Sequence, residues 1–366
     1  MGTEMAGYYW PIVTATAVVV ISIAAPLLLA EVFPWRNLYK QRNAKLTVTA
    51  KSFQGKTVLI TGANGAFGSR AASLIANRGV DTLVLVDVKD CEGVKSKILA
   101  DISGPNKPNI LVWQVDMLSY SSCQALAKKA RELKSLDHVL MTAGILAFKP
   151  RKSPEGWESS IQVNFLSTAL LALLLLPLLK SSPSNPASPV LTFTTTFGVY
   201  PSSLTMSVPK TGSYLGHLNN TKDGMIQAHQ YGRSKALLLY FARELANRIS
   251  RAQERGIQKV TVNSADPGSA WTPLTNPNQA KLIPRLIMDF SARDPMTCAT
   301  ALVNGVSATE NTHGKIVIDY DLSPYPPFME RKSGRAAQQR VWQETKAEFK
   351  KKVPEVEAIY RILDGE

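Results

Sequence analysis

The chain has 366 residues, enough for one large domain or two ordinary ones, and its apolar share of 45% allows a sizeable core. Its formal charge of +14 is spread along the chain without a basic motif interleaved with aromatic residues, so we expect no nucleic-acid partner. Three scattered cysteines and four unclustered histidines exclude a disulfide framework, suit a reducing compartment and predict no metal site.

The first element is an apolar run, "YYWPIVTATAVVVISIAAPLLLAEVF", from Tyr8 to Phe33. A run of ~20 apolar residues matches the ~30 Å hydrocarbon core of a bilayer, so we expect one transmembrane helix, with residues 9–33 in the lipid. The alternative is a cleaved secretory signal, which normally has basic residues ahead of a shorter apolar core. Here Glu4 is the only charged residue before the run, and many basic residues follow it. Because basic residues flank membrane spans on the cytosolic side, the rest of the chain is expected in the cytosol. We therefore expect a single-pass protein of the endoplasmic reticulum membrane, with the sequon at Asn219 unglycosylated.

From residue 55 onward, short apolar runs alternate with helix-length segments. The expected strands are 56–61, 81–87, 109–116, 137–144, 189–196, 259–268 and 314–319. This alternation predicts an α/β fold with βαβ units, a Rossmann-type doubly wound parallel sheet. The apolar run 165–179 is expected as a helix buried against the sheet rather than a second membrane span, because Pro177 interrupts it.

These patterns divide the chain into four parts. They are a membrane anchor at 1–36, a basic linker at 37–54, a catalytic domain at 55–325, and a C-terminal helical extension at 326–366. Within the catalytic domain we expect loops at 181–189 and an insertion at 198–226.

A glycine-rich turn, "TGANGAFG" at 61–68, lies between the first predicted strand and a helix. Gly62, Gly65 and Gly68 would permit a tight turn and let the backbone approach a pyrophosphate at the helix N-terminus. Asp87 ends the next strand, where a carboxylate can bind both ribose hydroxyls and repel a 2′-phosphate, which favours NAD over NADP. The alternative for Asp87 is a helix cap. Asp116, which closes the third strand, is either a contact to the adenine edge or a turn residue.

Tyr231 and Lys235 lie four residues apart in "QYGRSKALLLYFAREL" at 230–245, on a predicted helix. This spacing places a phenol and an ammonium on one helix face. The spacing alone does not separate a reactive pair from an ordinary surface pair.

Six motifs in register resemble the short-chain dehydrogenase/reductase family over about residues 55–320. They are "TGANGAFG" (61–68), "TAG" (142–144), "QVNFLS" (162–167), "TFTTT" (192–196), "YGRSK" (231–235) and "DPG" (266–268). The gap of 36 residues from Thr195 to Tyr231 resembles the retinol-dehydrogenase-like branch and related fungal biosynthetic enzymes.

The resemblance implies a set of catalytic roles. Tyr231 would be the general acid/base, with its pKa lowered by the Lys235 ammonium and by an oxidised nicotinamide. Thr195 would orient the substrate oxygen, where the family usually has serine, although Thr194 and Thr196 leave the register open. Asn164 would hold a water that relays protons, in a helix that the family bends there.

The resemblance also implies a set of cofactor contacts, with hydride passing directly between the cofactor and a carbinol carbon. The expected cofactor-binding residues are Gly62, Asn64, Gly65, Gly68, Asp87, Asp116, Ala143, Gly144, Tyr231, Lys235, Pro267, Gly268 and Thr272. Lys235 would bind the nicotinamide ribose, and Pro267 and Gly268 would shape the nicotinamide pocket, with Thr272 near the carboxamide.

Together these features predict a membrane-anchored, NAD-dependent oxidoreductase. Its expected substrate is a hydrophobic secondary alcohol or ketone such as a steroid, triterpenoid or other lipophilic metabolite, in a pocket roofed by 198–226 and 270–293. One alternative is an NADPH-dependent carbonyl reductase, and another is a non-catalytic nucleotide-binding membrane scaffold. Many family members form homodimers through helices that correspond to 160–180 and 230–250, so the resemblance allows a homodimer.

Overall fold

The computed structural model describes residues 34–50, 52–147, 151–179, 188–220, 224–256, 258–275 and 282–365. The apolar run 8–33, expected to form the membrane anchor, lies outside these residues. Within the described part, the helix from Ser159 to Leu178 is long and apolar enough to cross a bilayer, but 78% of its apolar window is buried inside the protein. The prediction that 165–179 forms a helix buried against the sheet is therefore confirmed.

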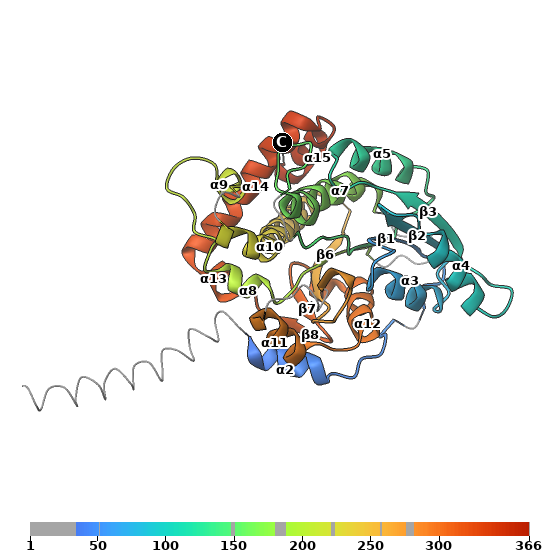
Figure 1. The fold of residues 1–366 in the computed structure, drawn as a ribbon. Helices are drawn as coiled ribbons and strands as arrows, with labels where there is room; N and C mark the ends of the chain where they lie inside the picture. Colours follow the sequence, from blue (N-terminus) through green and yellow to red (C-terminus); the bar gives the residue numbers. More distant parts are fainter. Residues whose placement is uncertain are drawn as a thin grey trace, which may run out of the picture.

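An eight-stranded sheet runs through the centre of the described part of the molecule (Figure 1). The strands follow the order β3-β2-β1-β4-β5-β6-β7-β8, and only β8 is antiparallel to its neighbour. Their bounds are β1 Thr57–Thr61, β2 Thr82–Asp87, β3 Asn109–Gln114, β4 His138–Met141, β5 Val190–Thr194, β6 Thr261–Asp266, β7 Ile316–Ile318 and β8 Asp321–Ser323. The seven predicted strands and the doubly wound parallel topology are confirmed. β8 was not predicted, because its three residues, Asp-Leu-Ser, contain no apolar run such as the one that marks β7.

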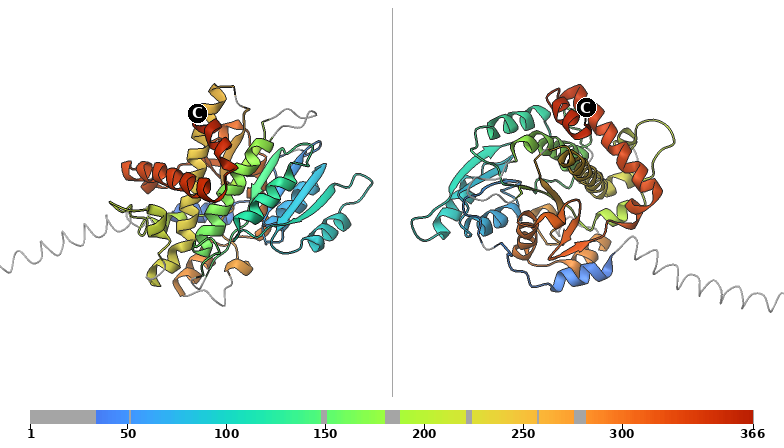
Figure 2. Two further views of the ribbon diagram at one scale, coloured as in Figure 1. Left: turned by 90° about the horizontal axis from the view of Figure 1, so that it is seen from above. Right: turned by 180° about the vertical axis from the view of Figure 1, so that it is seen from behind.

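Helices cover both faces of the sheet, and the alternation of side chains along β1 explains why. Val58 and Ile60 enter one apolar core with residues of α3, α4 and α12, whereas Leu59 enters a second core with residues of α5, α7 and α10. Figures 1 and 2 show these two layers. The helices are α3 Gly68–Ala76, α4 Glu92–Asp101 and α12 Pro295–Val306 on the first face, and α5 Tyr120–Ala130, α7 Thr168–Leu175 and α10 Gly224–Glu254 on the second.

Short elements complete the connections between these layers. They are α6 Ser159–Ile161, the π-helical turn η1 Gln162–Ser167, η2 Leu176–Leu178, α8 Val199–Ser202, α9 Tyr214–Leu218, η3 Pro273–Thr275, α11 Leu282–Ser291 and η4 Glu310–Thr312.

The C-terminal residues form three helices, α13 Pro327–Glu330, α14 Lys332–Lys352 and α15 Val356–Asp364. The Trp342 ring of α14 stacks on the Phe241 ring of α10, with centroids 5.3 Å apart. Gln338 of α14 donates a buried hydrogen bond of 2.7 Å to Glu244 of α10. Because α15 also contacts α7, the extension covers both helices through which the resemblance allows a homodimer.

The helix α2 Trp35–Asn43 crosses the expected boundary between the membrane anchor at 1–36 and the basic linker at 37–54, and the rest of the linker lies along the domain. Leu38 and Gln41 of α2 are buried, and α2 packs beside α11 (Figure 1). Farther along, the Thr49 amide donates to Asn304 Oδ1 of α12 across 2.9 Å. Side-chain and main-chain contacts therefore hold residues 35–50 against the catalytic domain.

Candidate functional site: the nucleotide turn and a tyrosine–lysine pair

The turn after β1 has no room for side chains at two of its glycines. Gly62 has a φ of +70°, and a Cβ there would lie 2.8 Å from the Ala143 amide nitrogen. A Cβ at Gly68 would lie 2.1 Å from the Gly62 oxygen. Gly65 closes the turn through its amide, which donates to the same oxygen across 2.9 Å. Within the described residues no side chain caps the start of α3, so its first amides suit the pyrophosphate of a dinucleotide.

Asp87 lies at the carboxyl end of β2, beside this turn. Its carboxylate accepts hydrogen bonds from the main-chain amides of Asn64, at 3.0 Å, and Lys89, at 3.1 Å. The carboxylate is thus held next to the glycine turn, where an adenosine ribose would lie.

Asp116 accepts from the Leu118 amide across 2.9 Å, which matches the turn-forming alternative for this residue.

Tyr231 lies near the start of α10, beside the turn that follows β5. A Cβ at Gly232 would lie 2.4 Å from the Gly198 oxygen, so only glycine permits this close approach of helix and turn. A Cβ at Gly198 would in turn lie 3.9 Å from Cε1 of the Tyr231 ring. Gly232 was missed from the sequence, although a glycine inside a predicted helix is a signal of close packing.

Lys235 lies one helical turn farther along α10 and is buried. Its Nζ donates to the Thr194 carbonyl oxygen across 2.8 Å. A Cβ at Gly144 would lie 3.7 Å from this Nζ and 3.2 Å from Asn164 Oδ1. Lys235, Asn164 and the predicted cofactor-binding stretch Ala143–Gly144 therefore converge at the carboxyl edge of the sheet.

Asn164 lies in the π-helical turn η1, at the place where the resemblance implies a bent helix. Its Oδ1 accepts from the Ile145 amide across 2.7 Å, and its Nδ2 donates to the Ile145 oxygen across 2.9 Å. The same Nδ2 also lies 3.0 Å from Ser234 Oγ of α10. Asn164 thus ties the chain after β4 to the helix that carries Tyr231, and Ser234 is a member of the site that was missed from the sequence.

The three successive threonines after Phe193 differ in the direction of their side chains. Thr192 bonds to Asn263 and lies near Gly305 of α12, whereas the Phe193 ring packs on Phe241 of α10. Because side chains alternate along a strand, Thr194 shares the α12 face and Thr195 shares the α10 face.

The hydroxyls of these three threonines differ in their hydrogen bonds. Those of Thr194 and Thr195 are buried without a hydrogen-bond partner, whereas Thr196 Oγ1 accepts from the Gly198 amide across 3.2 Å. Of the three, Thr195 therefore combines an uncommitted hydroxyl with the face that carries Tyr231.

In the protein without cofactor, the pKa of Tyr231 is raised rather than lowered. Burial, reinforced by the charge of Asp266, raises the pKa of Tyr231 to about 12. Burial lowers the pKa of Lys235 to about 8, against the opposing effect of Asp266. The lowering of the Tyr231 pKa was expected with the oxidised nicotinamide bound; in the protein alone, desolvation of the phenolate moves this pKa in the opposite direction. The positive charge of an oxidised nicotinamide remains as a source of such lowering.

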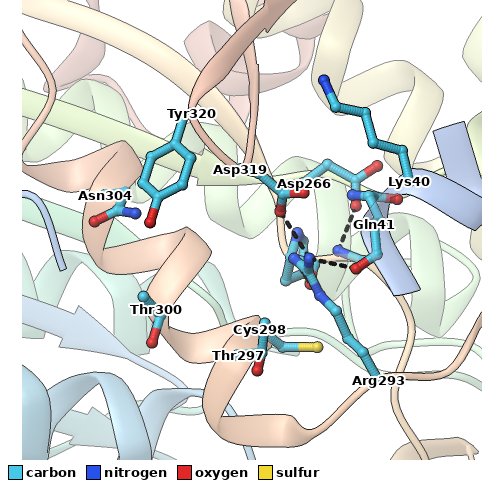
Figure 3. A network of polar contacts seen from close by, with 12 residues as sticks. Lys40, Gln41, Asp266, Arg293, Thr297, Cys298, Thr300, Asn304, Asp319 and Tyr320 are labelled. Carbon is cyan, nitrogen blue, oxygen red and sulfur yellow. Dashed lines mark hydrogen bonds and ion pairs between the residues drawn. The ribbon is translucent and has the colours of Figure 1, made fainter. Parts of the chain in front are cut away.

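A buried polar network follows β6 and was not predicted (Figure 3). Gly268 has a φ of +72°, and its amide donates to Asp266 Oδ1 across 2.8 Å. Arg293 donates from Nε and Nη2 to the Pro267 oxygen, at 3.1 and 2.7 Å, and pairs with Asp319 at 2.8 Å. Only the tertiary fold reveals Arg293, because no local pattern marks it. Thr272 lies beyond this network, directly before η3, and its amide donates to Oγ1 of Thr275, the last residue of η3.

Comparisons with known proteins agree with this arrangement. A family model described as short chain dehydrogenase matches residues 56–204. The short-chain dehydrogenase/reductase phmF of Phaeosphaeria nodorum is 30% identical over 332 residues, covering 89% of this chain and 95% of that protein. The short chain dehydrogenase macD of Penicillium terrestre is 29% identical, with 81% and 92% covered.

Two solved structures are similar in fold. An uncharacterized protein of Mycobacterium paratuberculosis aligns with a TM-score of 0.57 at 21% identity, covering 82% of this chain and 98% of that one. A short-chain dehydrogenase of Sphingobium yanoikuyae in complex with NADPH aligns with a TM-score of 0.51 at 16% identity, covering 79% and 95%.

The Rossmann-type sheet, the glycine turn and the Tyr231–Lys235 pair thus occur in a chain that aligns with fungal dehydrogenases along most of its length. Those relatives match the fungal biosynthetic branch that the sequence resembles. The chain therefore belongs to the short-chain dehydrogenase/reductase family, oxidoreductases that act on alcohol or ketone groups with a nicotinamide cofactor.

Proposed function

We propose that this protein is a membrane-anchored oxidoreductase that transfers hydride between NAD and a hydrophobic secondary alcohol or ketone. The convergence of Tyr231, Lys235 and Asn164 beside the glycine turn carries this proposal. A lipophilic metabolite such as a steroid or triterpenoid fits an enzyme whose catalytic domain is tethered to a bilayer.

The bound nicotinamide supplies or accepts the hydride. In oxidation Tyr231 takes the hydroxyl proton of the alcohol, and in reduction it returns a proton to the ketone oxygen. Thr195 donates to or accepts from the same oxygen and so orients the substrate. Lys235 would bind the nicotinamide ribose, while its bond to the Thr194 oxygen keeps α10 against β5. Asn164 holds Ile145 and Ser234, so that the strand edge and the helix keep their relative position.

NAD is the cofactor that Asp87 supports. A carboxylate beside the glycine turn accepts from both ribose hydroxyls and repels a 2′-phosphate. Lys89, whose amide bonds to Asp87, is a nearby cation that reduces this repulsion. That lysine, and the NADPH bound by the Sphingobium yanoikuyae enzyme, favour the second candidate, an NADPH-dependent carbonyl reductase.

Exposed apolar side chains on α2 and α11 support a membrane location. Trp35, Tyr39, Leu286 and Phe290 are 39%, 61%, 58% and 38% exposed, and the Trp35 and Phe290 rings lie 5.5 Å apart. The helix α2 directly follows the apolar run 8–33, and α11 packs against it. Tryptophan and tyrosine are enriched at membrane interfaces, so this surface suits the side of the domain nearest a bilayer.

Two features support a cytosolic catalytic domain on the endoplasmic reticulum. The described cysteines, Cys91, Cys123 and Cys298, are free and buried, as in proteins of reducing compartments. The amide of Asn219 accepts from the Glu158 amide across 2.7 Å and donates to the Gly156 oxygen across 3.1 Å. A glycan on Asn219 would replace one of the two hydrogens of the donating nitrogen and add bulk beside these contacts, so these bonds fit an unmodified side chain.

The function is tested with the purified full chain in detergent, NAD or NADPH, and a panel of hydroxysteroids and other lipophilic alcohols and ketones. We expect a change in absorbance of the reduced nicotinamide that disappears in Tyr231→Phe, while dinucleotide binding persists. Equal turnover in the wild type and the variant would refute the assignment of Tyr231. Dinucleotide binding with no turnover across the panel would favour the nucleotide-binding scaffold. Deletion of residues 1–33 should release the protein from membranes, and continued sedimentation with them would place the anchor elsewhere.

A further inference from the structure

The turn formed by Pro267 and Gly268 is held by a buried arginine. Two N–H groups of Arg293 converge on the Pro267 oxygen, and a Cβ at Gly268 would lie 2.8 Å from Arg293 Nε. The guanidinium is therefore packed directly beneath the turn. An arginine suits this place because its planar group offers several donors in fixed directions.

The same guanidinium binds α2, a helix that lies outside the part of the chain matched by the family model. Arg293 Nη1 donates to the Gln41 main-chain oxygen across 3.0 Å. Gln41 and Leu38 are 2% and 1% exposed, so this end of α2 is fully packed. The Gln41 amide also faces the Asp266 carboxylate and lowers its pKa, although burial of Asp266 has the larger, opposite effect.

The third contact of Arg293 is the Asp319 carboxylate, in the turn between β7 and β8. Asp319 has a φ of +59°, a left-handed conformation that, apart from glycine, aspartate and asparagine adopt more often than most residues. Figure 3 shows Gln41, Asp266 and Asp319 around the guanidinium. Arg293 therefore joins α2, the turn after β6 and the β7–β8 turn.

We propose that Arg293 is a positioning residue for the nicotinamide half of the cofactor, and that α2 completes this part of the site by clamping the arginine from outside. The inference rests on the proposed function, in which Pro267 and Gly268 shape the nicotinamide pocket. It goes beyond that function because it makes a helix next to the membrane anchor part of the cofactor site.

The charge of Asp266 links this network to the chemistry. Asp266 precedes the turn, accepts its Gly268 amide and acts on the pKa values of both Tyr231 and Lys235. A shift of the turn would thus displace the nicotinamide relative to the proton-transferring phenol. The glycine turn and Asp87 lie at other strand ends and do not contact Arg293, so binding of the adenosine half should not depend on it.

The test compares the affinities of the full chain in detergent for NAD and for ADP-ribose, which lacks the nicotinamide, by calorimetry. In Arg293→Met we expect the affinity for NAD to fall about tenfold or more, because misplacement of a contact has effects of that order, while ADP-ribose binding stays within about twofold. Arg293→Lys should be intermediate, since lysine can offer one N–H donor to the Pro267 oxygen but not the paired bonds of the guanidinium. The proposal is overturned if the ratio of the NAD affinity to the ADP-ribose affinity in Arg293→Met equals that of the wild type. This holds whether both affinities persist or both fall by the same factor.

Matched variants separate positioning from stability. Asp319→Asn keeps a side chain that tolerates a left-handed φ and leaves the bonds of Arg293 to Pro267 and Gln41, so the ratio should stay within about twofold. Leu38→Glu, which should undock α2, is expected to change the ratio in the direction of Arg293→Met, whereas Tyr39→Glu, at an exposed position of the same helix, should not. Equal ratios in Leu38→Glu and Tyr39→Glu would overturn the role of α2. A wild-type protein that binds neither ligand would instead refute the proposed function.

Discussion

The ammonium of Lys235 donates a 2.8 Å hydrogen bond to the main-chain oxygen of Thr194. This bond fixes α10 against the carboxyl end of β5, the strand end that also carries Thr195. It also directs the ammonium to a carbonyl of the protein, while burial raises the pKa of Tyr231. In the proposed function the phenol would therefore depend on the occupied site for its activation, and the surrounding charges would set the pH at which it works.

Asp266 is the charge that both members of the pair share, so Asp266→Asn should move the pH profile of alcohol oxidation to lower pH. Asp266 raises the pKa of Tyr231, and its neutralisation makes the phenolate available at lower pH. It also raises the pKa of Lys235, so the ammonium is lost at lower pH as well. The profile of kcat/KM against pH reports both groups. Asp294→Asn, at the exposed N-cap of α12, is the control, and equal profiles in the two variants would contradict the role of Asp266.

The threonine assignment predicts different outcomes for two adjacent substitutions. Thr195→Val should lower kcat by about 100-fold, because a hydrogen bond to the reacting oxygen is lost, whereas Thr194→Val should change it by less than about threefold. Valine preserves the shape of threonine, so both substitutions remove one hydroxyl and change little else. Steady-state kinetics with one substrate suffice, and a larger effect at Thr194 would reverse the assignment of the two strand faces.

Asp87→Ala should shift the cofactor preference from NAD toward NADP by about 10- to 100-fold, the range expected for hydrogen bonds to a charged group. The ratio of kcat/KM for the two cofactors measures this shift. Asp90→Ala removes an exposed carboxylate three residues away and should leave the ratio unchanged. A ratio that responds equally to both substitutions would show only a general effect of charge.

Buried His138 should make the folded protein less stable in acid. Burial, with help from the charge of Lys56, lowers its pKa to about 4. In the unfolded chain the same histidine has a pKa of ~6.5, so between pH 6.5 and pH 4 the unfolded chain binds a proton that the folded protein does not. The free energy of unfolding therefore falls by roughly 3 kcal/mol as the pH drops through this window. Urea unfolding at pH 7 and pH 4 measures the fall. We expect a smaller fall in His138→Gln than in the wild type or in His217→Gln, at an exposed position; equal falls would contradict it.

The C-terminal extension should keep the protein monomeric. α14 and α15 cover α10 and α7, and burial of the stacked Trp342 and Phe241 rings makes their separation costly. Light scattering of the full chain in detergent should therefore give the protein mass of one chain. A mass of two chains that persists on dilution would show that a different surface forms the dimer.

Much of the fold follows from local patterns in the sequence. Seven strands, their parallel order and the buried helix at 165–179 could be predicted because each depends on a run of apolar residues with the period of its own element. The glycine turn could be predicted for a similar reason, since close approach of main chains leaves only glycine at 62 and 68. The placement of Tyr231 and Lys235 on one face of a helix could be predicted from the helical period alone.

The tertiary structure decided what depends on residues far apart in the chain. The direction of Thr195 required the positions of α10 and α12 on the two faces of β5, and the raised pKa of Tyr231 required its burial and the nearby Asp266. Arg293 meets Gln41 across 252 positions of sequence, a contact for which neither segment carries a local signal. Such contacts arise from packing of whole elements, so periodicity and motif spacing, which report only neighbours along the chain, do not contain them.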